Sequence, residues 1–280
     1  MTVTATARSW FVTGASCGLG RHLAELLLAR GDRVAATARR ASELDDLAAA
    51  HARESLWVQA LDVTDADAVR RTVDAAFAAL GRVDVVVNSS GSGPLGAAEE
   101  ITDAHLRHQL DADLLGAVRI ARAALPHLRE QGGGRILQVT GAGGHDALPL
   151  MSLRLAAARG VEGFFTSLAR EVAPFGVRIT LIEQADAPAA DRAAPLAAYE
   201  GTPLAELRRT LTSGAVRPLN DPAKTARAVL DCADLEPAPL RLVLGSDAYE
   251  TTRTALARRL TDLEAQREIA WSTDVDDVRH

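Results

Sequence analysis

The sequence predicts a doubly wound α/β fold, in which a parallel seven-stranded sheet carries helices on both of its faces. Short apolar runs of strand length alternate with longer segments of helical periodicity along the 280 residues. Several of these runs are apolar throughout, as strands buried on both faces of a parallel sheet are. A glycine-rich turn also joins the first run to the first helical segment. We expect one domain over residues 1–280, with ligands bound beyond the carboxyl ends of the strands.

The first strand begins near Trp10 and runs into a turn with the spacing G-x-x-x-G-x-G, formed by Gly14, Gly18 and Gly20. Leucines at helical spacing follow over residues 21–29. Glycines let the backbone approach a pyrophosphate, and the N–H groups at the start of the helix then point at it. A turn without a ligand is the alternative. The predicted phosphate-binding residues here are Gly14, Ser16, Cys17, Gly18, Leu19 and Gly20.

The remaining elements follow in strand and helix order. Apolar runs predict strands over 33–38, 56–63, 83–87, 135–140, 177–183 and 240–244. Helices are predicted over 42–50, 64–80, 102–130 and 150–172 and from residue 222, and a charged helix precedes an acidic tail at 272–280. Ser42 and Thr64-Asp65 are expected helix caps, whereas three glycines at 132–134 and the Pro174/Gly176 pair end helices. Residues 187–215, rich in Ala and Pro, are expected to form a helical flap over a pocket.

Composition excludes several classes of protein. The net charge is −6, from 31 basic and 37 acidic residues, and no basic tract is present, so we expect no nucleic-acid partner. No segment approaches the roughly 18 apolar residues of a membrane span, and the first ten residues hold polar Thr and Arg, which predicts a cytoplasmic protein without a membrane partner. Two cysteines provide neither a metal site nor a disulfide framework. A small-molecule substrate is the expected partner.

Several of these segments resemble the short-chain dehydrogenase/reductase family, and especially the branch of the 17β-hydroxysteroid dehydrogenases. Residues 13–20 are similar to its cofactor motif, Leu61-Asp-Val63 to its adenine-contacting segment and Asn88-Ser-Ser-Gly91 to its Asn-Asn-Ala-Gly motif. The resemblance implies a Rossmann fold and a nicotinamide dinucleotide held also by Asp62, Val63, Asn88 and Gly91. It further implies a homodimer or homotetramer that associates through the helix at 150–172. For Asp62, a simple role at the helix entry is an equal alternative.

The resemblance also implies that the family's catalytic residues are replaced. Alignment on Val161-Glu-Gly-Phe164 puts Arg154 at the position of the catalytic Tyr and Ala158 at that of the Lys. Gly141, directly after Thr140, takes the position of the Ser, and Asp113 that of the Asn. Lys224 is the only lysine in the chain, so a Tyr-x-x-x-Lys pair exists in no frame. Gln184-Ala185 and Ala189 likewise depart from the segment that contacts the nicotinamide in the relatives.

Arg39 follows the second strand, where relatives that prefer NADP carry a base against the 2′-phosphate, and Ala38 stands where relatives that prefer NAD carry Asp. NADP(H) is therefore the expected cofactor, either as a reactant or as a structural group. A solvated surface charge is the alternative for Arg39.

The catalytic candidates are Arg154, Asp113, His145, Asp146 and Thr140. An arginine in the former catalytic centre can bind an anion, or it can form an ion pair with Asp113 or Asp146. An imidazole transfers protons near neutral pH, although His145 also fits a surface loop. Asp113 is either a desolvated base or a structural acceptor.

Three functions stay open on this basis. The first is a non-redox enzyme that catalyses cyclisation, elimination, rearrangement or proton transfer on a small organic metabolite, such as a polyketide. The second is an NADPH-dependent ketone or quinone reductase with an unusual proton source. The third is a dinucleotide-binding protein without catalytic activity.

Overall fold

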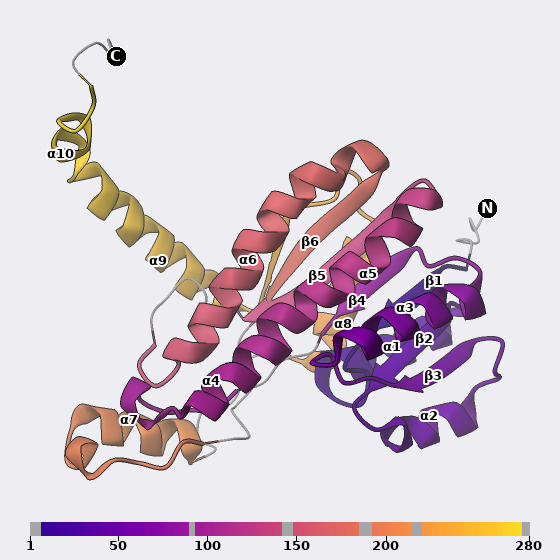
Figure 1. The fold of residues 1–280 in the computed structure, drawn as a ribbon, viewed down its shortest axis with the longest axis horizontal. Coiled ribbons are helices and arrows are strands. Elements are labelled where there is room, and N and C mark those ends of the chain that lie inside the picture. Colours follow the sequence, from indigo (N-terminus) through magenta and orange to yellow (C-terminus); the bar gives the residue numbers. More distant parts are fainter. Residues whose placement is uncertain (1–6, 90–92, 142–147, 185–191, 214–219, 276–280) are drawn as a thin grey trace.

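The computed structural model describes residues 7–89, 93–141, 148–184, 192–213 and 220–275, and its framework is one parallel sheet (Figure 1). The strand order is β3-β2-β1-β4-β5-β6-β7, and every pairing is parallel. The strands are β1 (Ser9–Val12), β2 (Arg33–Ala38), β3 (Leu56–Ala60), β4 (Val85–Asn88), β5 (Gly134–Gly141), β6 (Val177–Gln184) and β7 (Arg241–Leu244). The predicted seven-stranded doubly wound sheet is thus confirmed.

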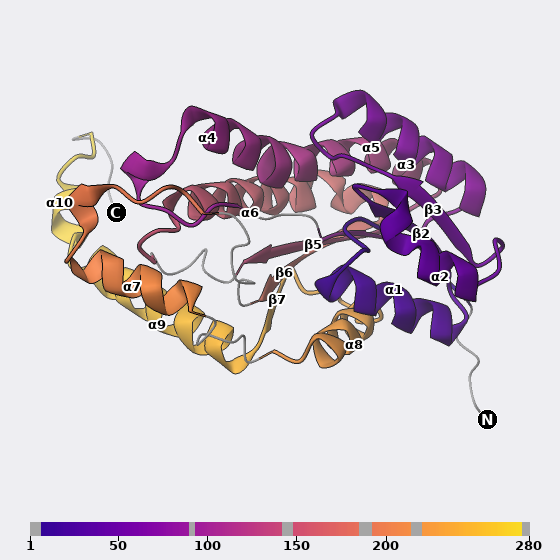
Figure 2. The same ribbon diagram turned by 90° about the horizontal axis from the view of Figure 1, so that it is seen from below.

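Helices cover both faces of this sheet, as Figure 2 shows. The helices are α1 (Gly18–Arg30), α2 (Asp45–Ala50), α3 (Ala66–Leu80), α4 (Asp103–Gln109), α5 (Gly116–Glu130), α6 (Ser152–Val172), α7 (Pro203–Thr212), α8 (Pro222–Cys232), α9 (Ser246–Glu264) and α10 (Arg267–Trp271). Apolar residues of α3, α5 and α6 form one core with strand residues such as Phe11 and Ile136. Residues of α1, α2 and α8 form a second core on the opposite face, around Trp10 and Val34.

The sheet reverses its winding at β1, which pairs with β2 on one side and with β4 on the other. Because all strands are parallel, their carboxyl ends lie at one edge of the sheet. In doubly wound sheets the crevice for a ligand opens at this reversal, beyond the carboxyl ends. The residues that leave β1 and β4 at this edge are therefore those to inspect first.

Of two helix caps predicted from the sequence, the structure contains one. Asp65 caps α3 as expected, because its carboxylate accepts hydrogen bonds from the N–H groups of Asp67 and Ala68, both at 2.9 Å. The expected cap at Ser42 is wrong. The chain first makes a 3₁₀ turn over Ala41–Leu44, and α2 begins only at Asp45.

The long helix predicted over 102–130 is present but not uniform. Residues Leu110–Leu115 adopt a π-helical turn that separates α4 from α5. Inserting such a turn rotates the residues before it relative to those after it, and such turns occur frequently at functional sites. Hydrophobic periodicity does not reveal it, since the period changes over only one turn.

The described part of the expected flap, residues 192–213, consists of a 3₁₀ turn and α7, which pack on the loop before α4. Leu204 and Leu207 lie against the buried Leu95 and Leu150. The rest of the predicted flap, 187–191 and 214–215, lies outside the described residues. Figure 1 shows α9 and α10 extending away from the sheet. Over the described ranges, none of the helices is long and apolar enough to cross a membrane.

Candidate functional site

The glycine-rich turn lies at the reversal of the sheet. The N–H of Thr13 donates to the carbonyl of Val87 on β4, and the N–H of Ala15 donates to that of Thr37 on β2, both at 2.9 Å. Gly14 and Gly18 have φ angles of 65° and 55°, a region that side-chain-bearing residues rarely adopt. The turn is thus anchored to the strands on both sides, and its glycines are required by the backbone.

The third glycine of the motif permits close packing of α1 on this turn. A Cβ at Gly20 would lie 2.9 Å from the carbonyl carbon of Gly14 and nearer still to its oxygen. Cys17 at the N-cap of α1 makes no capping hydrogen bond through its side chain, and the first turn of α1 holds no acidic residue. The N–H groups of this first turn therefore face the glycine turn without a side-chain acceptor from the cap.

This arrangement fits the pyrophosphate of a dinucleotide. The backbone of the turn presents no side chain at its three glycines, and the positive end of a 13-residue helix dipole points at it. Ser16 is half-buried and Cys17 is exposed, while Leu19 is buried in the core.

A buried chain of hydrogen bonds supports the turn from the side of β4 and β5. The Thr13 hydroxyl donates to Oδ1 of Asn88 at 2.6 Å, and Nδ2 of Asn88 donates to Oε1 of Gln138 at 2.9 Å. The N–H of Ser89 donates back to the Thr13 hydroxyl at 3.2 Å. Asn88 was a predicted site residue, but Gln138 was missed. Its signal was a polar residue between the apolar Leu137 and Val139 of β5. Gly91 lies outside the described residues.

The residues expected on the adenine side lie at the ends of β2 and β3. Arg39 is exposed and follows β2, and Asp62 follows the neighbouring strand β3. Hydrogen bonds from the N–H and the hydroxyl of Thr64 lower the pKa of the Asp62 carboxyl, and the positive charge of Arg39 acts in the same direction. Val63 is buried, and a Cβ at Gly116 of α5 would lie 2.8 Å from one of its methyl groups. Asp62 therefore makes a local turn here, and Val63 packs in the core.

Asp113 lies in the π-helical turn, at the junction between α4 and α5. Its carboxylate accepts a hydrogen bond from the amide of Gln109, the last residue of α4. The side chain of Gln109 is fully buried. Its amide lies so close to Gly93 that a Cβ at position 93 would overlap it. Its Oε1 has no hydrogen-bond partner among the described residues. Gln109 was not predicted from the sequence, and it restrains the orientation of the Asp113 carboxylate.

The other catalytic candidates lie on α6 and β5. Arg154 and Ala158 are one helical turn apart in the first half of α6, and both are half-buried. α6 packs closely on the π-helical turn, since a Cβ at Gly160 would lie 2.9 Å from a methyl group of Leu114. Thr140 and Gly141 end β5 and pair with Glu183 and Gln184 of β6.

His145 and Asp146 lie outside the described residues. Across the described segments, no cluster of three or more His, Cys, Asp and Glu side chains could hold a metal ion. The described candidates are therefore Asp113, Thr140 and Arg154, which lie in the π-helical turn, at the end of β5 and on α6, respectively. They supply one carboxylate, one hydroxyl and one guanidinium.

Comparison with known proteins identifies relatives of this chain. The family model described as short chain dehydrogenase matches residues 8–187. "Oxidoreductase BOA17" from Botryotinia fuckeliana is 36% identical over 270 residues, which cover 94% of this chain and 98% of that protein. The human 17-beta-hydroxysteroid dehydrogenase type 1 is 35% identical over 180 residues, 61% of this chain and 54% of that protein.

A solved structure of a short-chain dehydrogenase from Streptomyces avermitilis has a TM-score of 0.88 and 35% identity, and the match covers 98% of this chain and 100% of that one. The family expected from the motifs is thus confirmed by sequence and by structure. The chain belongs to the short-chain dehydrogenase/reductase family.

Proposed function

We propose that the protein binds NADP(H) at the turn between β1 and α1 and uses the reductase scaffold for a reaction other than hydride transfer. The binding part of the proposal rests on the geometry of the turn. The glycines and the start of α1 form a cradle for a pyrophosphate, and the buried Thr13–Asn88–Gln138 chain holds that cradle in place.

The preference for the phosphorylated cofactor rests on Arg39. This residue is exposed at the end of β2, and it has no ion pair or hydrogen bond with another described side chain that would occupy its guanidinium. A guanidinium can bind a 2′-phosphate through two parallel hydrogen bonds. The last residue of β2 is the buried Ala38, so this strand does not end in the carboxylate that would favour an unphosphorylated ribose.

Calorimetry with NADP⁺ and NAD⁺ tests the cofactor proposal. Loss of a charge-assisted hydrogen bond costs about 1.5–3 kcal/mol, so Arg39→Ala should weaken NADP⁺ binding at least about tenfold and leave NAD⁺ binding unchanged. Arg40→Ala is the matched control, because Arg40 is also exposed but forms an ion pair with Glu43. Equal affinity of the wild type for both cofactors would contradict the proposal.

The absence of a Tyr-x-x-x-Lys pair is the observation that carries the chemical part of the proposal. The chain has one lysine, Lys224, and it lies on α8, on the opposite face of the sheet from α6. Without a positioned acid, hydride transfer to a carbonyl would be slower by roughly 10²- to 10⁴-fold. A guanidinium is not a general acid near neutral pH, so an arginine at position 154 does not replace the tyrosine.

Arg154 can instead stabilise negative charge on a substrate oxygen. A substrate that passes through an enolate, a phenolate or a carboxylate would present such a charge to the guanidinium, and Asp113 is the proposed proton acceptor. The proposed substrate class is therefore a small organic metabolite with an acidic or enolisable position, such as a polyketide. The reaction class is proton transfer, elimination, rearrangement or cyclisation.

The test is turnover of such a compound by the Arg154→Ala variant, with product formation followed by mass spectrometry. By comparison with removal of one oxyanion donor, worth roughly 2–4 kcal/mol, we expect a loss of about 10²-fold or more in rate with unchanged NADP⁺ affinity. Arg154→Lys keeps the charge and should retain part of the rate. Unchanged turnover in Arg154→Ala would refute the role of this arginine.

A further inference from the structure

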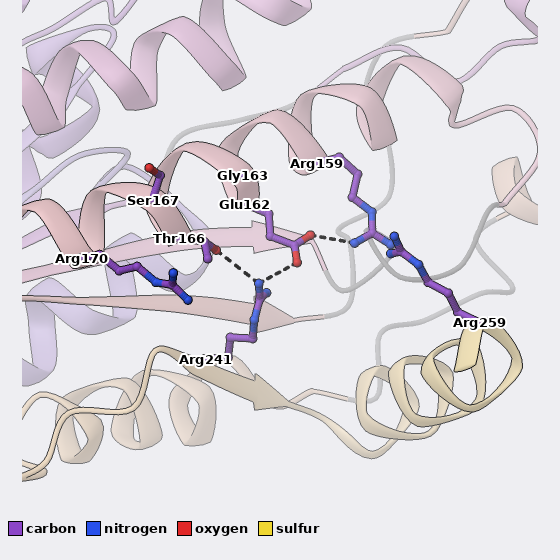
Figure 3. A pocket seen from close by; sticks show the side chains of 8 residues that line it. All are labelled: Arg159, Glu162, Gly163, Thr166, Ser167, Arg170, Arg241 and Arg259. Carbon is purple, nitrogen blue, oxygen red and sulfur yellow. Dashed lines mark hydrogen bonds and ion pairs between the residues drawn. The ribbon is translucent and has the colours of Figure 1, made fainter. Parts of the chain in front are cut away.

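A hollow of about 660 Å³ lies between α6, β7 and α9, and arginine side chains surround it. Arg159 and Arg170 reach it from α6, Arg241 from β7 and Arg259 from α9. Figure 3 shows these four guanidinium groups turned toward the same space. β7 is separated from β1 in the sheet by three strands, so this hollow is distinct from the glycine turn.

The floor of the hollow is held in a fixed arrangement. The guanidinium of Arg241 forms ion pairs with Glu183 and Glu162, both at 2.7 Å, and donates a hydrogen bond to the Thr166 hydroxyl at 3.4 Å. The second oxygen of Glu162 accepts a hydrogen bond from Arg159 at 2.8 Å. The side chain of Glu183 is only 3% exposed, which fixes the position of Arg241 from behind. Two of the four cations are thus pre-oriented.

The charges that line the hollow do not balance. Four arginines face one carboxylate, that of Glu162, so the lining carries 4 − 1 = +3 charges. Counting Glu183 behind Arg241 leaves +2. Within the described part of the chain, neither Arg170 nor Arg259 has an ion pair or a hydrogen bond through its side chain. Holding like charges around one space is unfavourable unless an anion enters it.

From this imbalance we propose that the hollow binds a small multivalent anion of the phosphoryl class. A guanidinium offers two parallel N–H donors that match the spacing of phosphate oxygens, and four such groups can surround a phosphoryl or diphosphate ligand. The fixed Arg159 and Arg241 provide the floor of this site. The unpaired Arg170 and Arg259, on separate helices, close it from two sides.

Calorimetric titration with inorganic pyrophosphate at constant ionic strength tests the proposal. Saturating NADP⁺ is present throughout, so that the glycine turn is not available to the probe. We expect one saturable site per chain in the wild type and at least tenfold weaker binding in the Arg170→Ala/Arg259→Ala double variant. Both residues are exposed, so thermal unfolding should show that the variant is folded. Arg258→Ala is the matched control, because Arg258 is an exposed neighbour on α9 that does not line the hollow. This variant should bind pyrophosphate with the affinity of the wild type.

Three results would overturn the proposal. One is the absence of saturable binding at about 10 mM pyrophosphate, where even a millimolar site would be occupied. Another is equal binding by the wild type and the double variant. The last is a change in oligomeric state on addition of pyrophosphate, measured by sedimentation, because it would assign the hollow to contacts between chains. Failure of NADP⁺ to bind would show separately as the absence of its own heat in the preceding titration.

Discussion

Replacement of Gly20 by alanine tests how the glycine turn is built. The added Cβ would stand 2.9 Å from the carbonyl carbon of Gly14, whereas ordinary contacts begin at 3.4 Å, so α1 must move back by at least about 0.5 Å. The obstacle is backbone, which cannot rotate away as a side chain can. Overpacking of this kind typically costs about 1–3 kcal/mol of folding free energy.

The size of the effect is measured against a second glycine-to-alanine variant. Gly163 also lies in a helix, α6, and a Cβ there would meet no atom within 4 Å. Both substitutions gain the same intrinsic helix preference, worth about 1 kcal/mol, so the difference between them isolates the clash. At roughly 2–4 °C for each kcal/mol in a chain of this size, Gly20→Ala should melt about 2–12 °C below Gly163→Ala.

The same displacement moves the N–H groups of α1 away from the bound pyrophosphate. We expect NADP⁺ to bind about tenfold more weakly to Gly20→Ala, because loss of one hydrogen bond to a charged phosphate costs about 1.5–3 kcal/mol. Gly163→Ala should bind NADP⁺ as the wild type does. Equal melting temperatures and equal NADP⁺ affinities for the two variants would refute the packing argument.

Two further predictions concern buried polar contacts. Burial alone would raise the pKa of Glu100, but hydrogen bonds from backbone N–H groups and from Arg208 lower it. The ion pair with Arg208 should therefore stabilise the region around α7 fully above pH 4.5, the ordinary pKa of glutamate. This stabilisation should be lost as the pH falls through the lowered pKa. Glu100→Gln should cost about 3–5 kcal/mol and increase hydrogen exchange over residues 192–212, whereas the exposed Glu99→Gln should not, and equal exchange in the two variants would contradict this. Gln138→Met removes the hydrogen bonds to Asn88 and to a neighbouring carbonyl, at about 0.5–1.5 kcal/mol each, and an unchanged denaturant midpoint would count against the buried chain.

The fold could be predicted from the sequence because its signals are local. Alternating apolar runs indicate the strands, and the three glycines indicate the turn before α1. Asp65 indicates the start of α3 by its side chain alone, since it binds N–H groups only two and three residues away. Ser42 carried the same signal and was wrong, because the chain first makes a 3₁₀ turn at that point.

The contacts that depend on distant residues could not be predicted in this way. Glu100 and Arg208 are separated by 108 residues, and Asn88 and Gln138 by 50. No local pattern relates the members of either pair. The amide of Gln109 over Gly93 is a similar case, because it requires the loop after β4 to lie against the end of α4. The candidate site was therefore predictable as a set of strand ends but not as a network.

Turnover of an enolisable substrate with NADPH present tests the central claim most directly. Product formation is followed by mass spectrometry while the absorbance of the reduced nicotinamide is recorded in the same sample. The proposed chemistry predicts that substrate is converted while this absorbance stays constant, and that Arg154→Ala slows the conversion by about 10²-fold. Loss of one NADPH for each product molecule formed would contradict it and would assign the protein to the reductases with an unusual proton source.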